Sequence, residues 1–334
     1  LIADGKVMVG DFDPLALKPE ERKAYRYDGP ETVYVFWGKH IPCAISGCGH
    51  RTPVMSSPVI ALKELTVKAW AHICKSCKKP FDIEDSEARM APDAKLVVAD
   101  DEKPFCLLDV KSSSVTCPSC GAKESFPSLG KAAKKKVRLS LMAHPRWLAG
   151  IAGTNPAGPL GGSVTDSAAD TCRWLDTRAK DAVVVELRGT LPDSVNIDGM
   201  VVQPNSKGGT VPKDGHFACG ACGAVQRIVV ATGASGKSAP VAPLMMQCFS
   251  ASLRKAGAAY GGRFFTAQAD TASFEAACRE WEVRRESDLK PFWPESDIPF
   301  GHMTHQRQPL PQHGYLRWAD MFNARQLLVH ALML

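Results

Sequence analysis

Closely spaced cysteines are the residues of this chain whose type and spacing could do chemistry. Pairs separated by two or four residues occur four times, and a single cysteine follows the last pair. Two thiolates this close can bind one tetrahedral ion from a single turn, and two such turns complete a structural zinc site. The sequence therefore predicts zinc as the cofactor, with the candidate ligands Cys43, Cys48, Cys74, Cys77, Cys117, Cys120, Cys219, Cys222 and Cys248.

The spacing leaves the grouping of these cysteines open. The first two pairs are 25 residues apart and fit one zinc-binding module, and the last pair lies the same distance before Cys248. In that grouping Ala251 occupies the place of a fourth thiol, so the second site is predicted to be partly degenerate, with His216 as a substitute ligand. The main alternative joins the second pair to the third. His50 and His72 are further candidate ligands.

The composition is that of a globular protein rather than a membrane or disordered one. Of the 334 residues, 45% are hydrophobic and 23% are charged, and no apolar run is long enough to span a bilayer. The net charge of +6 is compatible with a polyanionic partner. Cysteines two or four residues apart rarely bond to each other, and no secretory signal is recognised, so we expect a cytoplasmic protein without disulfides.

Strand-like segments lead into the cysteine pairs, and helical patterns follow later in the chain. β-branched and aromatic residues predict a hairpin across 58–73 and strands at 31–37, 81–83, 96–98, 114–116 and 181–187. Helical patterns occur at 166–180, 271–287 and 324–334. Asn323 and Gln326 form a capping box for the last helix. Because that helix is apolar nearly all round, we expect the chain to be an internal piece of a longer polypeptide.

These elements predict an α+β protein built from zinc-ribbon β-hairpin modules with a few helices. The chain divides into six segments. They are a lead-in with the first strand (1–42), zinc-ribbon modules (43–130), a basic linker with a small α/β segment (131–210), a second and partly degenerate module (211–265), a helix with a Pro-rich linker (266–315), and a terminal helix (316–334).

Basic residues in two places are candidate phosphate contacts. A run of lysines closely follows the third cysteine pair, and Arg263 lies beside two glycines and three aromatic residues. Side chains of this kind add affinity for nucleic acid without sequence specificity. The alternatives are a solvated linker for the run and a core strand for the aromatic segment. The candidate nucleic-acid ligands are Lys134, Lys135, Lys136, Arg138 and Arg263.

Four stretches together resemble the adenine-specific DNA methylases that contain a zinc ribbon and carry an uncharacterised N-terminal domain. The stretches are YVFW at 34–37 with the first cysteine pair, TCPSCG at 116–121, YGGRFF at 260–265 and the segment 314–328 ending in NARQLL. The resemblance implies an insertion in a Rossmann-like methyltransferase fold that uses S-adenosylmethionine and takes part in restriction-modification. It also implies that the first cysteine pair joins the third, in conflict with the spacing argument.

The functional prediction follows from this resemblance together with what the chain lacks. The family's glycine-rich cofactor loop and its Asp-Pro-Pro-Tyr-type catalytic loop do not occur in the sequence, so no catalytic residue is assigned. We expect a zinc-binding internal segment of a DNA adenine methyltransferase, with S-adenosylmethionine bound elsewhere in the parent protein. Its predicted partners are DNA and the rest of the same polypeptide. The alternative is a zinc-ribbon scaffold that binds proteins and contacts no DNA.

Overall fold

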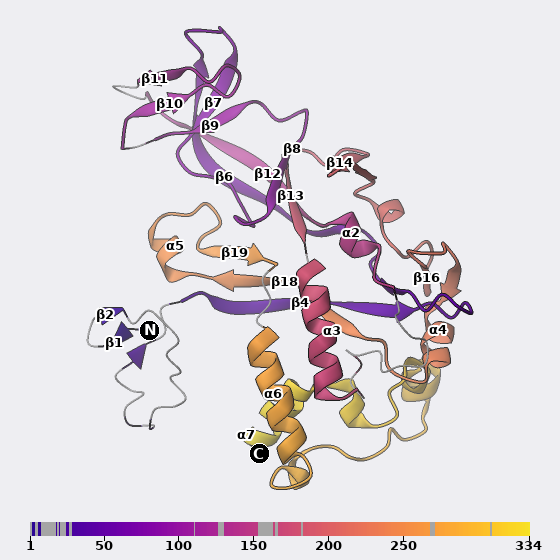
Figure 1. Cartoon of the computed structure of the whole chain (residues 1–334). Helices are drawn as coiled ribbons and strands as arrows, with labels where there is room; N and C mark the ends of the chain where they lie inside the picture. Colours follow the sequence, from indigo (N-terminus) through magenta and orange to yellow (C-terminus); the bar gives the residue numbers. More distant parts are fainter. Residues whose placement is uncertain are drawn as a thin grey trace.

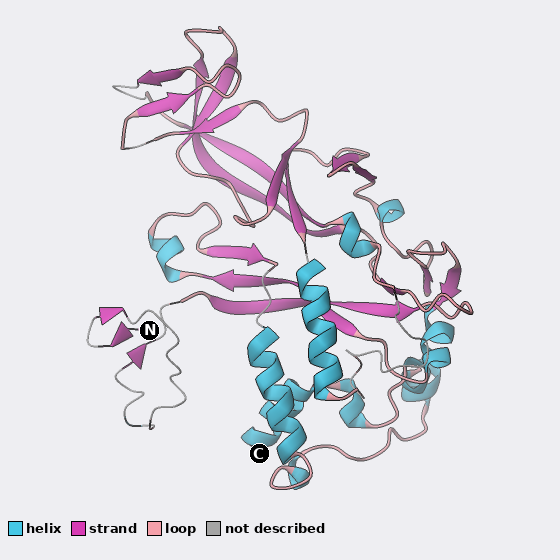
Figure 2. Ribbon diagram, viewed as in Figure 1, coloured by secondary structure: helices cyan, strands magenta, loops and turns pink. Residues whose placement is uncertain are grey.

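The structure, a computed structural model, has the predicted α+β composition, with several sheets and few helices (Figure 2). It describes residues 2–3, 6–7, 18, 20, 25–26, 29–109, 111–125, 130–152, 163, 166–181, 183–267, 271–307 and 309–334. Of the 42 residues of the predicted lead-in and first strand, 20 therefore lie outside the described residues. The molecule is elongated, with an arm built on a six-stranded sheet that extends upward from a body of sheet and helices (Figure 1). Among the described residues, no helix is long and apolar enough to cross a membrane.

The body is centred on a four-stranded antiparallel sheet with the order β19-β18-β4-β5. The predicted first strand is confirmed and continues further than expected, as β4 (Glu31–Pro42), because Trp37 and Ile41 pack inside the body. β4 pairs on one side with the next strand in the chain, β5 (Arg51–Pro53), and on the other side with β18 (Val241–Phe249). β18 pairs in turn with β19 (Arg263–Thr266).

Three helices lie beside this sheet, α3 (Ala168–Asp181), α6 (Thr271–Arg284) and α7 (Ala324–Met333) (Figure 1). The predicted capping box of α7 is confirmed, since Asn323 and Gln326 each accept a hydrogen bond from the other's backbone N–H. The shorter helices are α2 (Pro145–Leu148), α4 (Ile228–Ser235), α5 (Ala251–Lys255), η2 (Ser206–Gly208), η3 (Lys290–Phe292), η4 (His302–Arg307), η5 (Leu310–His313) and η6 (Trp318–Met321).

The arm is a six-stranded sheet with the order β8-β13-β12-β6-β7-β9. Two of its strands, β6 (Val59–Ile73) and β12 (Ala133–Ala143), pair antiparallel over ten positions and form the shaft. The predicted hairpin at 58–73 is therefore wrong, because this segment is one strand of 15 residues, about 50 Å long. The other strands are β7 (Pro80–Glu84), β8 (Lys95–Val98), β9 (Phe105–Leu107) and β13 (Val184–Arg188).

The remaining strands form two-stranded hairpins and one small sheet. The hairpins are β10 (Ser114–Thr116) with β11 (Lys123–Ser125), β14 (Val195–Ile197) with β15 (Met200–Val202), and β16 (His216–Ala218) with β17 (Val225–Arg227). The small sheet comprises β1 (Ile2–Ala3), β2 (Lys6–Val7) and β3 (Tyr25–Arg26).

The largest hydrophobic cluster joins the arm to the body. Residues of β6 and β12, including Leu65 and Leu139, pack with Met245 of β18 and Phe265 of β19. Trp147 is fully buried in this cluster. A side chain at Gly38 would place its Cβ 2.4 Å from the Trp147 ring, so only glycine fits beside it.

A buried ionic network ties three segments of the arm together. Arg188 and Glu84 are 1% and 0% exposed and form a bidentate ion pair. Arg188 also donates to Glu102 at 3.0 Å and lies 3.5 Å from the centre of the Phe105 ring. Lys135 completes the network, with its Nζ 2.9 Å from Glu102 and 3.3 Å from Glu84. Since buried charges need partners, β7, β12 and β13 are held in fixed register.

Candidate metal centres

Eight of the predicted ligands converge into two groups of four thiols. The distal cluster, at the end of the arm, contains Cys74, Cys77, Cys117 and Cys120. The proximal cluster, in the body, contains Cys43, Cys48, Cys219 and Cys222. Within each group the sulfur atoms all lie within 4.8 Å of one another, and all of these cysteines are free thiols.

Each cysteine pair lies in the loop of a β-hairpin. Ile73 pairs with Pro80 around the first distal loop, and Thr116 pairs with Lys123 around the second. The proximal loops are closed by the β4–β5 and β16–β17 hairpins. Because both cysteines of a loop face its inner side, two hairpins that meet tip to tip bring four thiols together.

The three Cys-x2-Cys loops share one pattern of backbone hydrogen bonds. The first cysteine of each loop is Cys74, Cys117 or Cys219. Its backbone N–H donates to the carbonyl of the residue five positions later, and its carbonyl accepts from the N–H of the residue four positions later, at 2.9–3.0 Å. The residue after the second cysteine has a positive φ, 73° at Gly121 and 71° at Gly223. Glycine adopts this conformation without strain. The first distal loop has Lys78 at this position, with a φ of 62°, so only the other two loops have the residue type that favours the turn.

The sulfur–sulfur distances match those of a tetrahedral zinc site. The closest contacts between the two loops are 3.6 and 3.7 Å in the distal cluster and 3.7 and 3.8 Å in the proximal cluster. Four thiolates at about 2.3 Å from one Zn²⁺ ion would lie about 3.8 Å apart. Both groups therefore have the dimensions for one tetrahedral ion each.

The thiols differ in how easily they lose a proton. Burial raises the pKa of Cys43 to about 12. Burial also opposes ionisation of Cys117, but the backbone N–H groups of Cys120 and Ser119 outweigh it and lower the pKa of Cys117 to about 7. In the proximal cluster the backbone N–H of Ala224 lowers the pKa of Cys222. Each cluster thus contains a thiol whose pKa is lowered, and a bound cation would favour the thiolate form of every ligand.

The grouping corrects both the one inferred from spacing and the one that the family resemblance implied, in which the first pair joined the third. The second pair joins the third, as in the alternative, whereas the first pair joins the fourth across 171 and 179 residues of sequence. The pair at Cys219 and Cys222 is therefore complete rather than degenerate. Cys248 lies outside both clusters, buried on β18 opposite Thr32. His216 is also outside them, with its Nδ1 2.8 Å from the carbonyl of Asp214.

Two histidines, His50 and His72, lie near the clusters but belong to neither group of four ligands. His72 places its Nε2 2.9 Å from Glu124, whose other oxygen accepts from the backbone N–H of Lys75 at 2.7 Å. His50 contacts the carbonyl of Ala149 at 2.6 Å. Sequence reasoning did not identify Glu124 as a supporting residue, because a glutamate four residues after a cysteine pair carries no signal of its own.

The surroundings of the proximal cluster are uncharged and tightly packed. Gln226 donates to the Cys43 sulfur at 3.0 Å and accepts from the backbone N–H of Ala44 at 2.8 Å. The N–H of Gly220 donates to the Thr52 hydroxyl at 2.9 Å. A Cβ at Gly220 would lie 2.0 Å from the carbonyl oxygen of Ala149. The cluster is therefore built into the body.

The predicted phosphate contacts lie in the shaft and the body rather than in a linker. Lys134, Lys136 and Arg138 project from the outer face of β12, and Lys136 pairs with Glu64 at 2.8 Å. Lys135 points to the opposite face, into the ionic network, so its charge is balanced inside the arm. Arg263 is exposed on β19.

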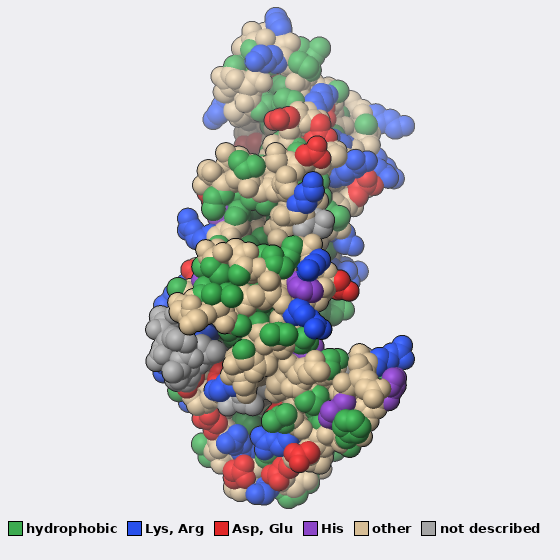
Figure 3. Space-filling view, turned by 90° about the vertical axis from the view of Figure 1, so that its right-hand side faces the viewer, with side chains coloured by type: hydrophobic (Ala, Val, Ile, Leu, Met, Phe, Trp, Pro, Cys, Tyr) green, Lys and Arg blue, Asp and Glu red, His purple; other side chains and the backbone are tan. Residues whose placement is uncertain are grey.

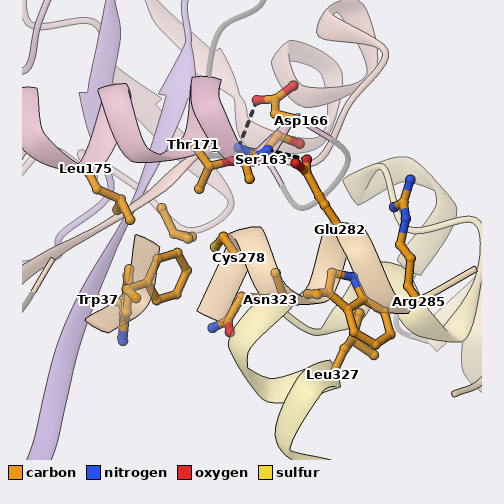
Figure 4. Close-up of a pocket in the computed structure, with 15 residues that line it drawn as sticks. Trp37, Ser163, Asp166, Thr171, Leu175, Cys278, Glu282, Arg285, Asn323 and Leu327 are labelled. Carbon is orange, nitrogen blue, oxygen red and sulfur yellow. Dashed lines mark hydrogen bonds between the residues drawn. The ribbon is translucent and has the colours of Figure 1, made fainter. Parts of the chain in front are cut away.

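A separate cavity lies between α3, α6 and α7 in the body (Figure 4). Its volume is about 70 Å³, far below the size of a cofactor pocket. Its polar groups already have partners, because Asp166 accepts from the Ser163 N–H at 3.0 Å and Glu282 accepts from the Ala168 N–H at 2.6 Å. Glu282 thereby supports the start of α3, so we assign this cavity a structural role.

Comparison with known proteins gives no match. No protein-family model, no curated protein and no solved structure matches this chain significantly.

Proposed function

We propose that the chain binds two Zn²⁺ ions, one in each four-thiol cluster, and that both ions are structural. The observation that carries this proposal is the convergence of eight cysteines into two groups with inter-loop sulfur distances of 3.6–3.8 Å. Four thiolates satisfy tetrahedral zinc fully and leave no position for water, as in structural rather than catalytic sites. Soft thiolate donors in this geometry also suit iron, so the metal is tested directly.

Holding the hairpins together is the role that these ions fit. The hydrophobic cluster beneath the distal site is small, with Phe81, Ile83 and Val115 as its principal buried residues besides the cysteines. The thiols alone would leave the loops held only by local hydrogen bonds. An ion that bridges two hairpins supplies the missing cohesion, and structural zinc contributes directly to folding free energy.

The wider role that we propose is a zinc-stabilised scaffold within an adenine-specific DNA methyltransferase, where it helps to hold DNA. The resemblance of four sequence stretches supports this assignment. The cofactor S-adenosylmethionine and the catalytic loop would belong to the rest of that enzyme. None of the residues described here is assigned a catalytic step.

Metal analysis of the purified full chain tests the proposal. We expect two zinc ions per chain by plasma mass spectrometry, with no visible absorption from iron–thiolate charge transfer. Cys117→Ser and Cys219→Ser should each lower the content to one, since they remove one ligand from different clusters. A metal content below 0.2 per chain after expression with added zinc, with a circular dichroism spectrum unchanged by chelators, would refute it.

A further inference from the structure

The loops of the distal cluster carry most of the unbalanced positive charge at the end of the arm. We define the distal tip as residues 74–79 and 117–123. It contains four lysines, all exposed: Lys75, Lys78, Lys79 and Lys123. Within the part of the chain that the structure describes, none of the four forms an ion pair within 4.0 Å. On the face shown in Figure 3, blue side chains cap the upper end of the molecule, and red ones begin below it.

The carboxylates nearest to this tip are already engaged. Glu124 is 9% exposed and is held by His72 and by the backbone N–H of Lys75. Asp109 accepts hydrogen bonds from Ser112 and its neighbours in its own turn. A zinc tetrathiolate would carry about two negative charges, and Glu124 and Asp109 add one each, so the formal charges of the tip balance. The four ammonium groups are exposed, whereas Glu124 and two of the four thiols are buried, so the tip presents positive charge at its surface.

The basic run of β12 differs from the tip in this respect. Lys136 and Arg138 share the carboxylate of Glu64, and Lys135 is paired inside the arm. Its most available cation is Lys134, which lies directly across from Lys68 on β6. Lys68 is itself paired with Asp85 at 3.9 Å, so Lys134 alone extends the positive charge of the tip along the shaft, while the rest of the run is largely neutralised.

We infer that the distal tip binds the phosphate backbone of duplex DNA. Lysine side chains on a loop of fixed backbone can reach phosphate oxygens of the DNA backbone, and such contacts do not depend on the base sequence. Neither tip segment contains an aromatic residue on which unpaired bases could stack, so a duplex fits better than a single strand. Among the described residues next to the tip, Ile73 is the exposed large apolar one, whereas protein interfaces are built around several apolar or aromatic anchors.

This inference rests on the proposed zinc binding, because the ion fixes the two loops that carry the lysines. It adds a location to the proposed DNA role, and that location differs from the β12 run on which the sequence focused. The proximal cluster offers an internal contrast. Its loops, residues 44–47 and 220–221, contain only Ala, Ile, Ser and Gly, so the same ligands there are accompanied by no positively charged side chain in the loops.

The test measures binding of the zinc-loaded full chain to a fluorescent 20-base-pair duplex at several salt concentrations. The test variant K75Q/K78Q/K79Q/K123Q removes the tip charges. The control variant K180Q/K207Q/K213Q/K255Q removes four exposed lysines elsewhere. We expect the test variant to bind at least tenfold more weakly at 50 mM salt. Its log–log salt slope should be smaller by about 3 to 4, since each lost phosphate contact removes about 0.9. The control should bind within threefold of the original protein.

The possible outcomes separate the two proposals. Two zinc ions per chain with no duplex affinity at 50 mM salt, or with equal losses in both variants, would overturn the inference and leave the zinc proposal intact. Equal affinity for single-stranded DNA or for a polyglutamate peptide would overturn the choice of duplex DNA. DNA binding by a metal-free protein through the same lysines would support the contact surface and overturn its dependence on the ion.

Discussion

The two four-thiol clusters have the same ligands and nearly the same sulfur geometry, but they are embedded in opposite surroundings. The proximal cluster lies in the body, where a backbone carbonyl approaches Gly220 and Gln226 bonds to a ligand sulfur. The distal cluster lies at the end of a long two-stranded shaft, above a small hydrophobic cluster and among exposed lysines. The residues between the ligands, rather than the ligands, thus determine what each site can do.

The two clusters also connect different parts of the chain. The distal cluster joins hairpins whose cysteines are 40 and 46 residues apart, all within the arm. The proximal cluster joins cysteines 171 and 179 residues apart and lies against Ile41 and Phe217 in the body. Loss of the distal ion should therefore be a local event, and loss of the proximal ion should affect the whole body.

Cys219→Ser tests this difference most strongly. We expect it to remove the proximal ion and to lower the free energy of unfolding by more than about 5 kcal/mol, because structural zinc contributes on the order of 10 kcal/mol to small sites. Cys117→Ser should remove the distal ion and leave the melting of the body unchanged. Hydrogen exchange would then increase in β7, β10 and β11 alone. Similar thermal destabilisation by both variants would contradict the comparison.

Arg188→Met tests the buried ionic network of the arm. The substitution leaves Glu84 buried with only Lys135 as a partner, so we expect a loss of about 3–5 kcal/mol in urea unfolding. Zinc content should stay at two per chain, since no ligand is touched. Combining it with Glu84→Gln should restore part of the loss. A change below about 1 kcal/mol would show that the network does not hold the arm in register.

Acid should destabilise the body through His40, which is fully buried. Burial and the nearby Arg178 lower the pKa of His40 to about 3, and Arg178 donates to its Nε2 at 3.1 Å. The unfolded chain therefore takes up the proton first, so stability is retained above about pH 6.5 and is lost as the pH falls toward 3.

A comparison with His40→Gln isolates this effect. Glutamine keeps an acceptor for Arg178 but does not titrate. Between pH 7 and pH 4, the unfolding free energy of the original protein should fall by about 3 kcal/mol more than that of the variant. Acid release of zinc is common to both proteins and cancels in the difference. Parallel pH profiles would contradict the assignment of a neutral buried histidine.

Glycine substitutions give the smallest and most direct comparison. Gly220→Ala would drive a Cβ into the Ala149 carbonyl and should cost about 1–3 kcal/mol more than its matched controls. The controls are Gly121→Ala and Gly223→Ala, which have φ of 73° and 71° with open space around them. Each should cost about 1 kcal/mol from backbone strain alone. If all three denature at the same urea concentration, the proximal loop is not packed as described.

Local features of the fold could be predicted from the sequence because they depend on neighbouring residues. The strand leading to Cys43, the short strand before Cys117 and the cap at Asn323 are confirmed. The hairpin at 58–73 was wrong because the segment is one continuous strand, and Lys63 and Glu64 lie in its middle. In the structure they continue a strand opposite Leu139 and Arg138.

The grouping of the cysteines could not be predicted from the sequence, because it is set by contacts between distant segments. Antiparallel pairing of β4 with β18 brings the segment near Cys219 beside the loop of Cys43. Equal 25-residue gaps along the chain are a coincidence, and Cys248 faces a strand neighbour instead of an ion. The burial of Lys135 was equally hidden, since its three carboxylate partners lie at least 33 residues earlier in the chain, two of them on β7 and the third at Glu102.

The distance along the chain between Cys43 and Cys222 has a consequence for biosynthesis. These residues are 179 positions apart, so a ribosome that adds about 5–20 residues per second needs on the order of 10 s to make the second after the first. The distal thiols are all synthesised well within that interval. The distal cluster can therefore bind its ion before Cys219 and Cys222 have been synthesised, and the proximal cluster in the body forms last.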